Sequence, residues 1–317
     1  MNTLLGVIVP AFNEEESVFD SGKRLQKKLQ QLTTDQLISP QSFILFIDDG
    51  SSDKTWQHFQ TLHKENTNIF KAIKLSKNCG HQKALLSGLH YVEGKVDIAI
   101  SIDIDLQQDI NAMDEFIKQY HQGYDIVYGV RVNRESDAFF KKLSALSFYT
   151  LMKWGGVEII KNHADYRLLS RKVLKVVKEF KEYNLFLRGI LLNIGFRKVA
   201  VYHQVFKREL GSSKYSITKM LSLAADGITS FSIAPIRLIT IVGAFVFLFS
   251  FCMIAYILLM KFKGHVVPGW ASTLIPIYFI GGVQLISLGV VGEYIGKIYM
   301  ETKARPPYII EDIIAGP

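Results

Sequence analysis

Residues 43–55 read FILFIDDGSSDKT, an apolar run that passes through a polar loop into a pattern of helical period. Residues 43–47 suit a buried strand, and either Ser52 or Asp53 can cap the helix predicted over 52–64. A strand that leads through a short loop into a helix is the repeating unit of a parallel sheet covered by helices. This stretch therefore predicts an α/β domain.

The same alternation continues on both sides of this stretch. Apolar runs predict strands at 4–10, 43–47, 69–75, 96–102 and 125–130, and polar runs of helical period predict helices at 15–32, 52–64, 82–92 and 110–121. After residue 131 the order is less regular, with helices predicted at 138–154, 170–180 and 184–195, a polar loop carrying Asp165, and a strand at 197–203. We expect a mostly parallel sheet covered by helices.

Composition narrows the class of protein. The chain has 317 residues, of which 49% are hydrophobic and 21% are charged, so it is not a disordered protein. Its net charge of +8 suits an anionic membrane surface, a phosphorylated substrate or nucleic acid. Only two cysteines occur, Cys79 and Cys252, and they offer neither a disulfide framework nor a zinc-binding spacing.

Two long apolar stretches lie in the C-terminal third. Residues 238–260 and 266–292 contain no Asp, Glu, Lys, Arg or His, and each is long enough to cross a hydrocarbon core of roughly 30 Å. Residues 216–233 have one apolar and one polar helical face, which favours an amphipathic helix in the membrane interface; an ordinary surface helix is the alternative. The predicted parts are a soluble domain at 1–215, a juxtamembrane helix at 216–233, two transmembrane helices at 234–300 and a tail at 301–317.

Flanking charges orient the predicted spans. The apolar run at 4–10 is short, lacks a basic leader and continues into a polar loop, so it predicts a strand rather than a signal peptide. Basic residues gather before the first span and after the second, and they outnumber Lys261 and Lys263 between the spans. These residues are Lys214, Lys219, Arg237, Lys297, Lys303 and Arg305. We expect a multi-pass membrane protein with its soluble domain and both termini in the cytoplasm.

Acidic side chains follow two of the predicted strands, at the sheet edge where parallel α/β folds bind ligands. Asp103 and Asp105 follow one strand, and two carboxylates so placed are costly unless a cation binds there. A divalent cation shared with a substrate diphosphate would resolve that cost, although an isolated Asp-x-Asp can also cap a helix. Asp48 and Asp49 follow another strand, where a carboxylate can accept hydrogen bonds from a nucleobase or a ribose.

Four motifs occur in order: PAFNEE at 10–15, DDGSSDKT at 48–55, NCGHQ at 78–82 and DIDLQ at 103–107. Together they resemble the family 2 glycosyltransferases, which have a GT-A fold. The chain is most similar to the polyprenyl-phosphate glycosyltransferases, the group of dolichol-phosphate mannose synthase and bactoprenol glucosyl transferase. The resemblance spans essentially the whole chain and implies a Rossmann-like GT-A catalytic domain over residues 1–215.

The resemblance also implies roles for individual residues. The nucleotide-sugar pocket is expected at Pro10, Asn13, Glu14, Asp49 and Asp103. The site for Mg²⁺ or Mn²⁺ is expected at Asp103, Asp105 and Gln107. The catalytic residues are expected to be Asp105, Asp165 and Arg131, because residues 165–168 (DYRL) are similar to the family's Asp-Phe-Arg-Leu segment beside the reacting sugar. The chain departs from the family at 108–110, where QDI stands in place of an Asp-Pro-Pro or His-Pro-Pro stretch.

The acceptor implied by the resemblance is undecaprenyl phosphate. Its phosphate oxygen is already anionic near neutral pH, so the enzyme needs fixed cations more than a base. Arg131 corresponds to an arginine near the acceptor phosphate, and Arg134, Arg208 and Lys214 could join it. Asp165 then positions or stabilises a reacting group. Arg167 and Arg171 could have a structural role instead of a functional one, through an ion pair with Asp165 or Glu179.

The expected activity is therefore inverting transfer of one sugar from a UDP-sugar to a polyprenyl phosphate at the bacterial cytoplasmic membrane. Glucose is the first choice of sugar, N-acetylglucosamine the second and mannose from GDP-mannose the third, and the resemblance implies a homo-oligomer. A processive polysaccharide synthase is one alternative, but its Gln-x-x-Arg-Trp motif is absent, since none of Trp56, Trp154 and Trp270 follows an arginine. A non-catalytic nucleotide-sugar-binding membrane scaffold is another, and it would not need the metal carboxylates. Nucleic-acid binding is not expected beside a carboxylate-lined edge and apolar spans.

Overall fold

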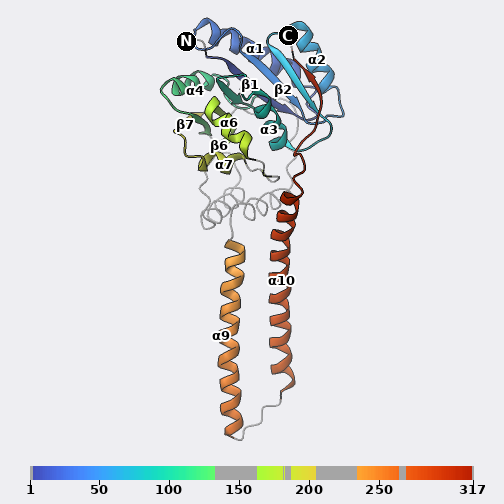
Figure 1. The fold of residues 1–317 in the computed structure, drawn as a ribbon, viewed down its shortest axis with the longest axis vertical. Helices are drawn as coiled ribbons and strands as arrows, with labels where there is room; N and C mark the ends of the chain where they lie inside the picture. The colour runs from blue at the N-terminus through green and yellow to red at the C-terminus, as the bar shows by residue number, and fades with distance from the viewer. Residues whose placement is uncertain are drawn as a thin grey trace. The chain divides into compact units, whose positions relative to one another are not determined.

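The computed structural model describes residues 3–132, 163–180, 182, 187–204, 234–263 and 269–315. These residues divide into two compact units. One unit holds a β-sheet with its covering helices and includes residues 304–315, and the other holds two long helices (Figure 1).

The first unit is built on a single eight-stranded sheet. Its strands are β1 (Leu5–Ala11), β2 (Phe43–Asp48), β3 (Phe70–Leu75), β4 (Ile98–Ser101), β5 (Ile126–Arg131), β6 (His163–Ser170), β7 (Lys198–His203) and β8 (Ile310–Ile314). They lie side by side in the order β7-β5-β6-β4-β1-β2-β3-β8. The pairings that involve β6 or β8 are antiparallel, and the other pairings are parallel. The mostly parallel α/β fold expected from the sequence is confirmed.

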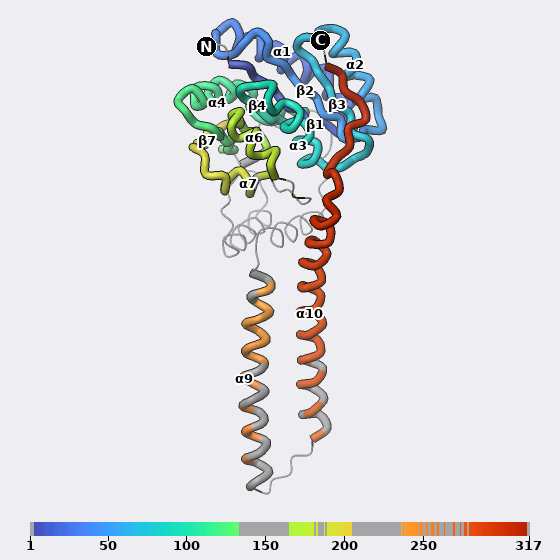
Figure 2. The backbone as a smooth tube through the Cα atoms, viewed as in Figure 1, coloured from blue at the N-terminus to red at the C-terminus, as the bar shows by residue number. Residues whose placement is uncertain are grey.

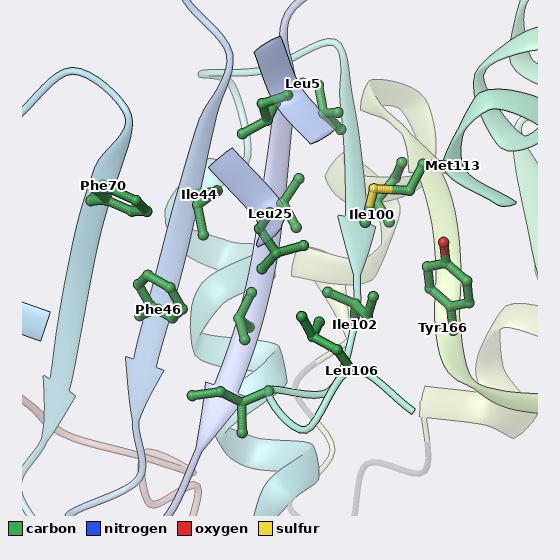
Figure 3. Close-up of a cluster of buried hydrophobic side chains, with 14 of the residues drawn as sticks. Leu5, Leu25, Ile44, Phe46, Phe70, Ile100, Ile102, Leu106, Met113 and Tyr166 are labelled. Carbon is green, nitrogen blue, oxygen red and sulfur yellow. The ribbon is translucent and has the colours of Figure 1, made fainter. Parts of the chain in front are cut away.

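Helices cover both faces of this sheet. They are α1 (Val18–Thr34), α2 (Thr55–Glu65), α3 (His81–Val92), α4 (Ala112–His121), α6 (Arg171–Glu179) and α7 (Leu187–Asn193). Apolar side chains of α1, α2 and α4 join one core with alternate strand residues, and Figure 3 shows Leu25 and Met113 packed beside Ile44 and Ile100. On the opposite face α3 approaches so closely that a Cβ on Gly88 would lie 2.6 Å from Ile8.

The strand β6 corrects one prediction from the sequence. Asp165 does not lie in a polar loop but inside β6, between β4 and β5, where its exposed fraction is 8%. Arg167 two residues later is fully buried and ion-pairs with Asp165, so the two charges neutralise each other within the domain. Tyr166 and Leu168, which alternate with these two charged residues along the strand, belong to the apolar core. Because these two charged residues interrupt the apolar pattern, hydropathy alone does not predict this strand.

The C-terminal residues were expected to form a tail over 301–317. Residues 310–314 instead form β8, which pairs antiparallel with β3 at the edge of the sheet. In Figure 2 the red C-terminal segment runs along β3. The tail therefore contributes a strand to the domain that lies at the other end of the sequence.

The second unit consists of α9 (Ala234–Phe262) and α10 (Trp270–Thr302), which contact each other and run side by side in Figure 2. Within the part of the chain that the structure describes, one segment meets the length and composition of a membrane-crossing helix, Phe279–Thr302 of α10, with a mean hydropathy of 1.4. The helix α9 has 29 residues, and the expectation that both helices cross a membrane stays a prediction. The amphipathic helix predicted at 216–233 and the helix predicted at 138–154 lie outside the described residues.

Candidate active site

The loops that follow β1 and β2 are tied together by backbone-to-side-chain hydrogen bonds. Asn13 has a φ of 51°, in the left-handed region that asparagine tolerates better than most residues. Its N–H donates to Ser51 Oγ at 2.9 Å, and its Oδ1 accepts from the Ser52 N–H at 2.9 Å. The Glu14 N–H donates to Thr55 Oγ1 at 3.0 Å. Asn13 therefore braces the second loop with its own side chain.

Asp49 connects this pair of loops to the start of α3. Its Oδ1 accepts from the Cys79 N–H at 2.7 Å, and its Oδ2 accepts from the Gly80 N–H at 2.9 Å. Burial raises the pKa of Asp49, and the two amide hydrogen bonds act in the opposite direction. The backbones approach closely here, because a Cβ on Gly50 would lie 2.4 Å from the carbonyl carbon of Lys77. A carboxylate has about four lone-pair sites, so Asp49 keeps acceptor capacity for a ligand.

Asp48 and Pro10 lie near the ends of the two strands that lead into these loops. Asp48 is fully buried, its Oδ1 accepts from the Ser51 N–H at 3.0 Å, and its Oδ2 has no hydrogen-bond partner among the described residues. Burial raises the pKa of Asp48. Pro10 is a buried residue of β1 opposite Ile47 of β2. Both residues are therefore buried at the ends of neighbouring strands, directly before the two loops.

Asp103 and Asp105 lie on a tight turn directly after β4. The Leu106 N–H donates to the Asp103 carbonyl at 3.2 Å, and Leu106 has a φ of 45°. The Gln107 N–H donates to Asp105 Oδ1 at 3.3 Å. The side chain of Gln108 also contacts Asp103, since its Nε2 donates to Asp103 Oδ2 at 2.5 Å. Both carboxylates are therefore held on one turn and are partly exposed.

This turn fits a metal that takes part of its coordination from a substrate. Among the described residues no three His, Cys, Asp or Glu side chains are grouped so that they could hold a metal ion. Mg²⁺ in nucleotide-binding enzymes commonly uses one or two carboxylates together with substrate phosphates. Asp103 and Asp105 would provide the two carboxylates of such a donor set, and Gln107 lies on the same turn.

His81 joins the turn to β6. Its Nε2 lies 3.6 Å from Asp103 Oδ1 and 3.4 Å from Asp165 Oδ2. Asp165 also ion-pairs with Arg167, and the hydroxyl of Ser101 donates to the Asp165 carbonyl oxygen. The expected metal carboxylate and the aspartate of the DYRL segment thus meet around one imidazole at the N-terminus of α3.

The two arginines that were open to a structural interpretation have different partners. Arg167 pairs with Asp165, as that alternative expected. Arg171 instead pairs with Asp97 at 3.1 Å. The guanidinium of Arg167 is fully buried beside the carboxylate of Asp165.

Arg131 is the one residue of the expected acceptor group that the structure describes. It ends β5 opposite His203 of β7, and its Nε is buried without a hydrogen-bond partner within the described ranges. His203 is buried, which lowers its pKa, and its ring packs edge-on against Tyr166 with 5.2 Å between centroids. Tyr166 in turn donates its hydroxyl to the Asp109 carbonyl at 3.0 Å. The other expected acceptor residues, Arg134, Arg208 and Lys214, lie outside the described residues.

Two residues of the site were not singled out from the sequence. His81 stands inside the NCGHQ motif, which was part of the resemblance but to which no role was given. Gln108 was noticed only because it replaces the family's usual residue after the DIDLQ motif. The motif spacing could have indicated His81, whereas the burial of Gln108, with an exposed fraction of 1%, requires the folded chain.

Comparison with known proteins places the chain in a family. Residues 6–178 match glycosyl transferase family 2, and residues 234–298 match the GtrB C-terminal hairpin. A protein of Bacillus subtilis (strain 168) named uncharacterized glycosyltransferase YkoT is 45% identical over 97% of this chain and 91% of that protein. The bactoprenol glucosyl transferase of Shigella phage SfX is 37% identical over 97% of this chain and 98% of that protein.

Among solved structures, mannosyltransferase PcManGT from Pyrobaculum calidifontis, in complex with GDP-Man and Mn²⁺, is similar with a TM-score of 0.46 and 13% identity. The match covers 91% of this chain and 88% of that chain, and it is too distant to inform the site. The sequence relatives and the two family matches together confirm the resemblance. The chain belongs to glycosyl transferase family 2, carries the GtrB C-terminal hairpin, and is a glycosyltransferase.

Proposed function

We propose that this enzyme transfers one sugar, with inversion, from a UDP-sugar to undecaprenyl phosphate or a similar polyprenyl phosphate. The observation that carries the proposal is the meeting of three motifs at the N-terminus of α3. Asp49 accepts the amides of Cys79 and Gly80, and the next residue, His81, reaches Asp103 and Asp165. Relatives named bactoprenol glucosyl transferase support glucose as the sugar and a polyprenyl phosphate as the acceptor.

The donor would lie across the two carboxylate loops. Asp49 would accept hydrogen bonds from the base or ribose, with Pro10, Asn13 and Glu14 as further residues of the nucleotide-sugar pocket. Asp103, Asp105 and Gln107 would hold Mg²⁺ or Mn²⁺ against the donor diphosphate. A bound divalent cation supplies Lewis-acid stabilisation of the departing diphosphate. The N-terminus of α3 adds the favourable dipole that helix starts offer to anions.

The acceptor needs positioning rather than deprotonation. Its phosphate oxygen attacks as an anion, so the chain must hold two anionic substrates close together. Arg131 would present a fixed cation to that phosphate, with Arg134, Arg208 and Lys214 as further cations. Asp165 is fixed by the buried Arg167, and it would orient the sugar between donor and acceptor.

The hairpin gives a reason for the lipid acceptor. We propose that α9 and α10 both cross the bacterial cytoplasmic membrane and that residues 216–233 lie in its interface. Residues 1–215 and both termini would then lie on the cytoplasmic side, where a polyprenyl phosphate presents its headgroup. A homo-oligomer would keep several such sites on one membrane face.

The test uses the full chain in detergent with undecaprenyl phosphate and Mg²⁺ or Mn²⁺. Radiolabelled UDP-glucose, UDP-N-acetylglucosamine and GDP-mannose are offered separately, and label is counted in the organic phase with and without EDTA. Label from UDP-glucose that EDTA abolishes is the expected result. An NMR spectrum of the purified lipid product would show a β-linkage if the transfer inverts.

The same assay separates the alternatives. A non-catalytic scaffold would bind UDP but place no label in the lipid from any donor. A processive synthase would yield a polymer that grows with time. Either outcome would overturn the proposed activity, and label from UDP-N-acetylglucosamine alone would change only the sugar.

A further inference from the structure

The C-terminal strand contacts the sheet edge that leads into the nucleotide loops. The strand β8 pairs antiparallel with β3, with Lys74 opposite Asp312 and Leu75 opposite Ile310. The ammonium of Lys74 lies 3.0 Å from Glu311 Oε1. The pairing thus covers β3 up to its last residue.

The contact continues past the end of the strand. The Ser76 N–H donates to the Ile309 carbonyl at 2.9 Å. The hydroxyl of Tyr308 lies 2.9 Å from Nδ1 of His90 on α3. Burial raises the pKa of Tyr308 and lowers that of His90, so both groups are neutral near pH 7. The segment 308–314 is therefore fixed to both β3 and α3.

Ser76 is the first residue of the loop that orients Asp49. Within that loop the amides of Cys79 and Gly80 bind the two oxygens of Asp49. The loop starts at the hydrogen bond to Ile309 and ends at α3, which Tyr308 contacts through His90. The start of the Asp49-binding loop is thus hydrogen-bonded to the C-terminal segment, and the helix that follows the loop is contacted by the same segment in its last turn.

We propose that residues 308–314 are a positioning element for the nucleotide site. They fix the loop 76–80 so that its amides meet Asp49, and without them the carboxylate loses its orientation toward the base or ribose. The donor part of this inference rests on the proposed function, in which Asp49 contacts the nucleotide. In the sequence, residues 303–309 lie between α10 and β8.

The first experiment needs no nucleotide. Hydrogen–deuterium exchange is measured on the full chain in detergent, on a chain ending at Pro307, and on a control chain ending at Ala315 that keeps β8. We expect amide exchange at residues 76–80 to accelerate about tenfold in the chain ending at Pro307, because Ser76 loses its hydrogen bond to Ile309 and β3 loses its partner strand. Exchange at residues 103–108 should stay unchanged in all three. Unchanged exchange at 76–80 would overturn the proposal.

The second experiment measures UDP affinity by calorimetry in the same three proteins. The chain ending at Pro307 should bind about tenfold more weakly, and a synthetic peptide of residues 305–317 should restore the affinity while a scrambled peptide should not. Equal affinities in all three proteins would contradict the proposed positioning. Failure of the intact chain to bind UDP would count against the proposed function, and the exchange experiment would still decide the role of the strand.

A full-length variant covers the case in which the shortened chain does not fold. Tyr308→Phe removes only the hydroxyl that contacts His90. It should accelerate exchange at residues 76–80 and weaken UDP binding about threefold, while leaving exchange at residues 103–108 unchanged. Wild-type exchange at 76–80 together with wild-type affinity would overturn the proposal.

Discussion

The two sides of the candidate active site are held by different forces. On the side of β1, β2 and β3, the loops are fixed by hydrogen bonds between side chains and backbone, as at Asn13 and Asp49. On the side of β4 and β6, the site is organised by charges, with Asp165 placed between Arg167 and His81. The first arrangement suits recognition of a fixed nucleotide, and the second suits stabilisation of changing charge.

This difference predicts different responses to substitution. Removing one member of a buried ion pair leaves a buried charge uncompensated, which costs about 3–5 kcal/mol. Leaving a buried amide without its acceptor costs about 1–3 kcal/mol. Substitutions on the charged side should therefore be the more severe.

Arg167→Met should have the largest effect on stability. It leaves the Asp165 carboxylate without the cation that accompanies it inside the sheet, and we expect a loss of about 3–5 kcal/mol. Thermal unfolding of the full chain in detergent measures this. The matched control is Arg171→Met, whose ion pair with Asp97 is partly exposed and should contribute less than about 1 kcal/mol. Equal melting temperatures for the two variants would contradict the account of the charged side.

Asp105→Asn should have the largest effect on transfer. The side chain keeps its size, but one anionic ligand of the proposed metal is lost, and we expect the rate of lipid labelling to fall about 10²–10³-fold. The melting temperature should stay close to that of the wild type because Asp105 is partly exposed. Asp20→Asn, at an exposed position of α1, is the control and should transfer normally. Wild-type transfer by Asp105→Asn would remove the metal assignment.

Asp49→Asn and Asp48→Asn form a matched pair on the hydrogen-bonded side. Both oxygens of Asp49 accept backbone amides, so an Asn amide must face one of these donors, and we expect a loss of about 1–3 kcal/mol and weaker UDP binding. Only one oxygen of Asp48 accepts a hydrogen bond in the described structure, so Asp48→Asn can turn its amide away from the Ser51 N–H.

The pH dependence of Asp48→Asn follows from burial. Because burial raises the pKa of Asp48, the folded state holds this proton more tightly, and the associated stability is lost as pH rises through the raised pKa. The Asn variant lacks that loss. Its melting temperature relative to the wild type should increase from pH 4 to pH 7, and a relative decrease would contradict the assignment.

His203→Phe should have the smallest effect. Burial lowers the pKa of His203, so the unfolded chain takes up a proton more readily, and stability falls as pH drops below about 6.5. Phe retains the ring contact with Tyr166 and does not titrate. Between pH 7.5 and pH 5.5 the variant should lose less stability than the wild type. The pKa of His90 is also lowered by burial, so the stability of the variant should still depend on pH to some extent.

The first five strands could be predicted because each is an apolar run that ends in a polar loop. β6 could not, since Asp165 and Arg167 break the apolar pattern and only their mutual ion pair allows burial. β8 carries Glu311 and Asp312 and pairs with a strand more than two hundred residues away in the sequence, so no local pattern marks it.

For the site, the sequence located the carboxylates but not what they contact. The motif DIDLQ indicated Asp103 and Asp105, yet the side chains that contact Asp103 are those of Gln108 and His81 rather than that of Gln107. Asn13 was expected in the nucleotide pocket, and the structure has its side chain hydrogen-bonded to the Ser52 amide. Contacts of this kind depend on where separate loops meet, and no spacing in the sequence records that.

The most direct test of the central claim is mass spectrometry of the lipid after incubation of the purified full chain with UDP-glucose, Mg²⁺ and undecaprenyl phosphate. The account predicts a lipid heavier by one hexose, formed by the wild type and almost absent with Asp105→Asn. A lipid with a ladder of added hexoses, or unmodified lipid from a protein that binds UDP, would contradict it.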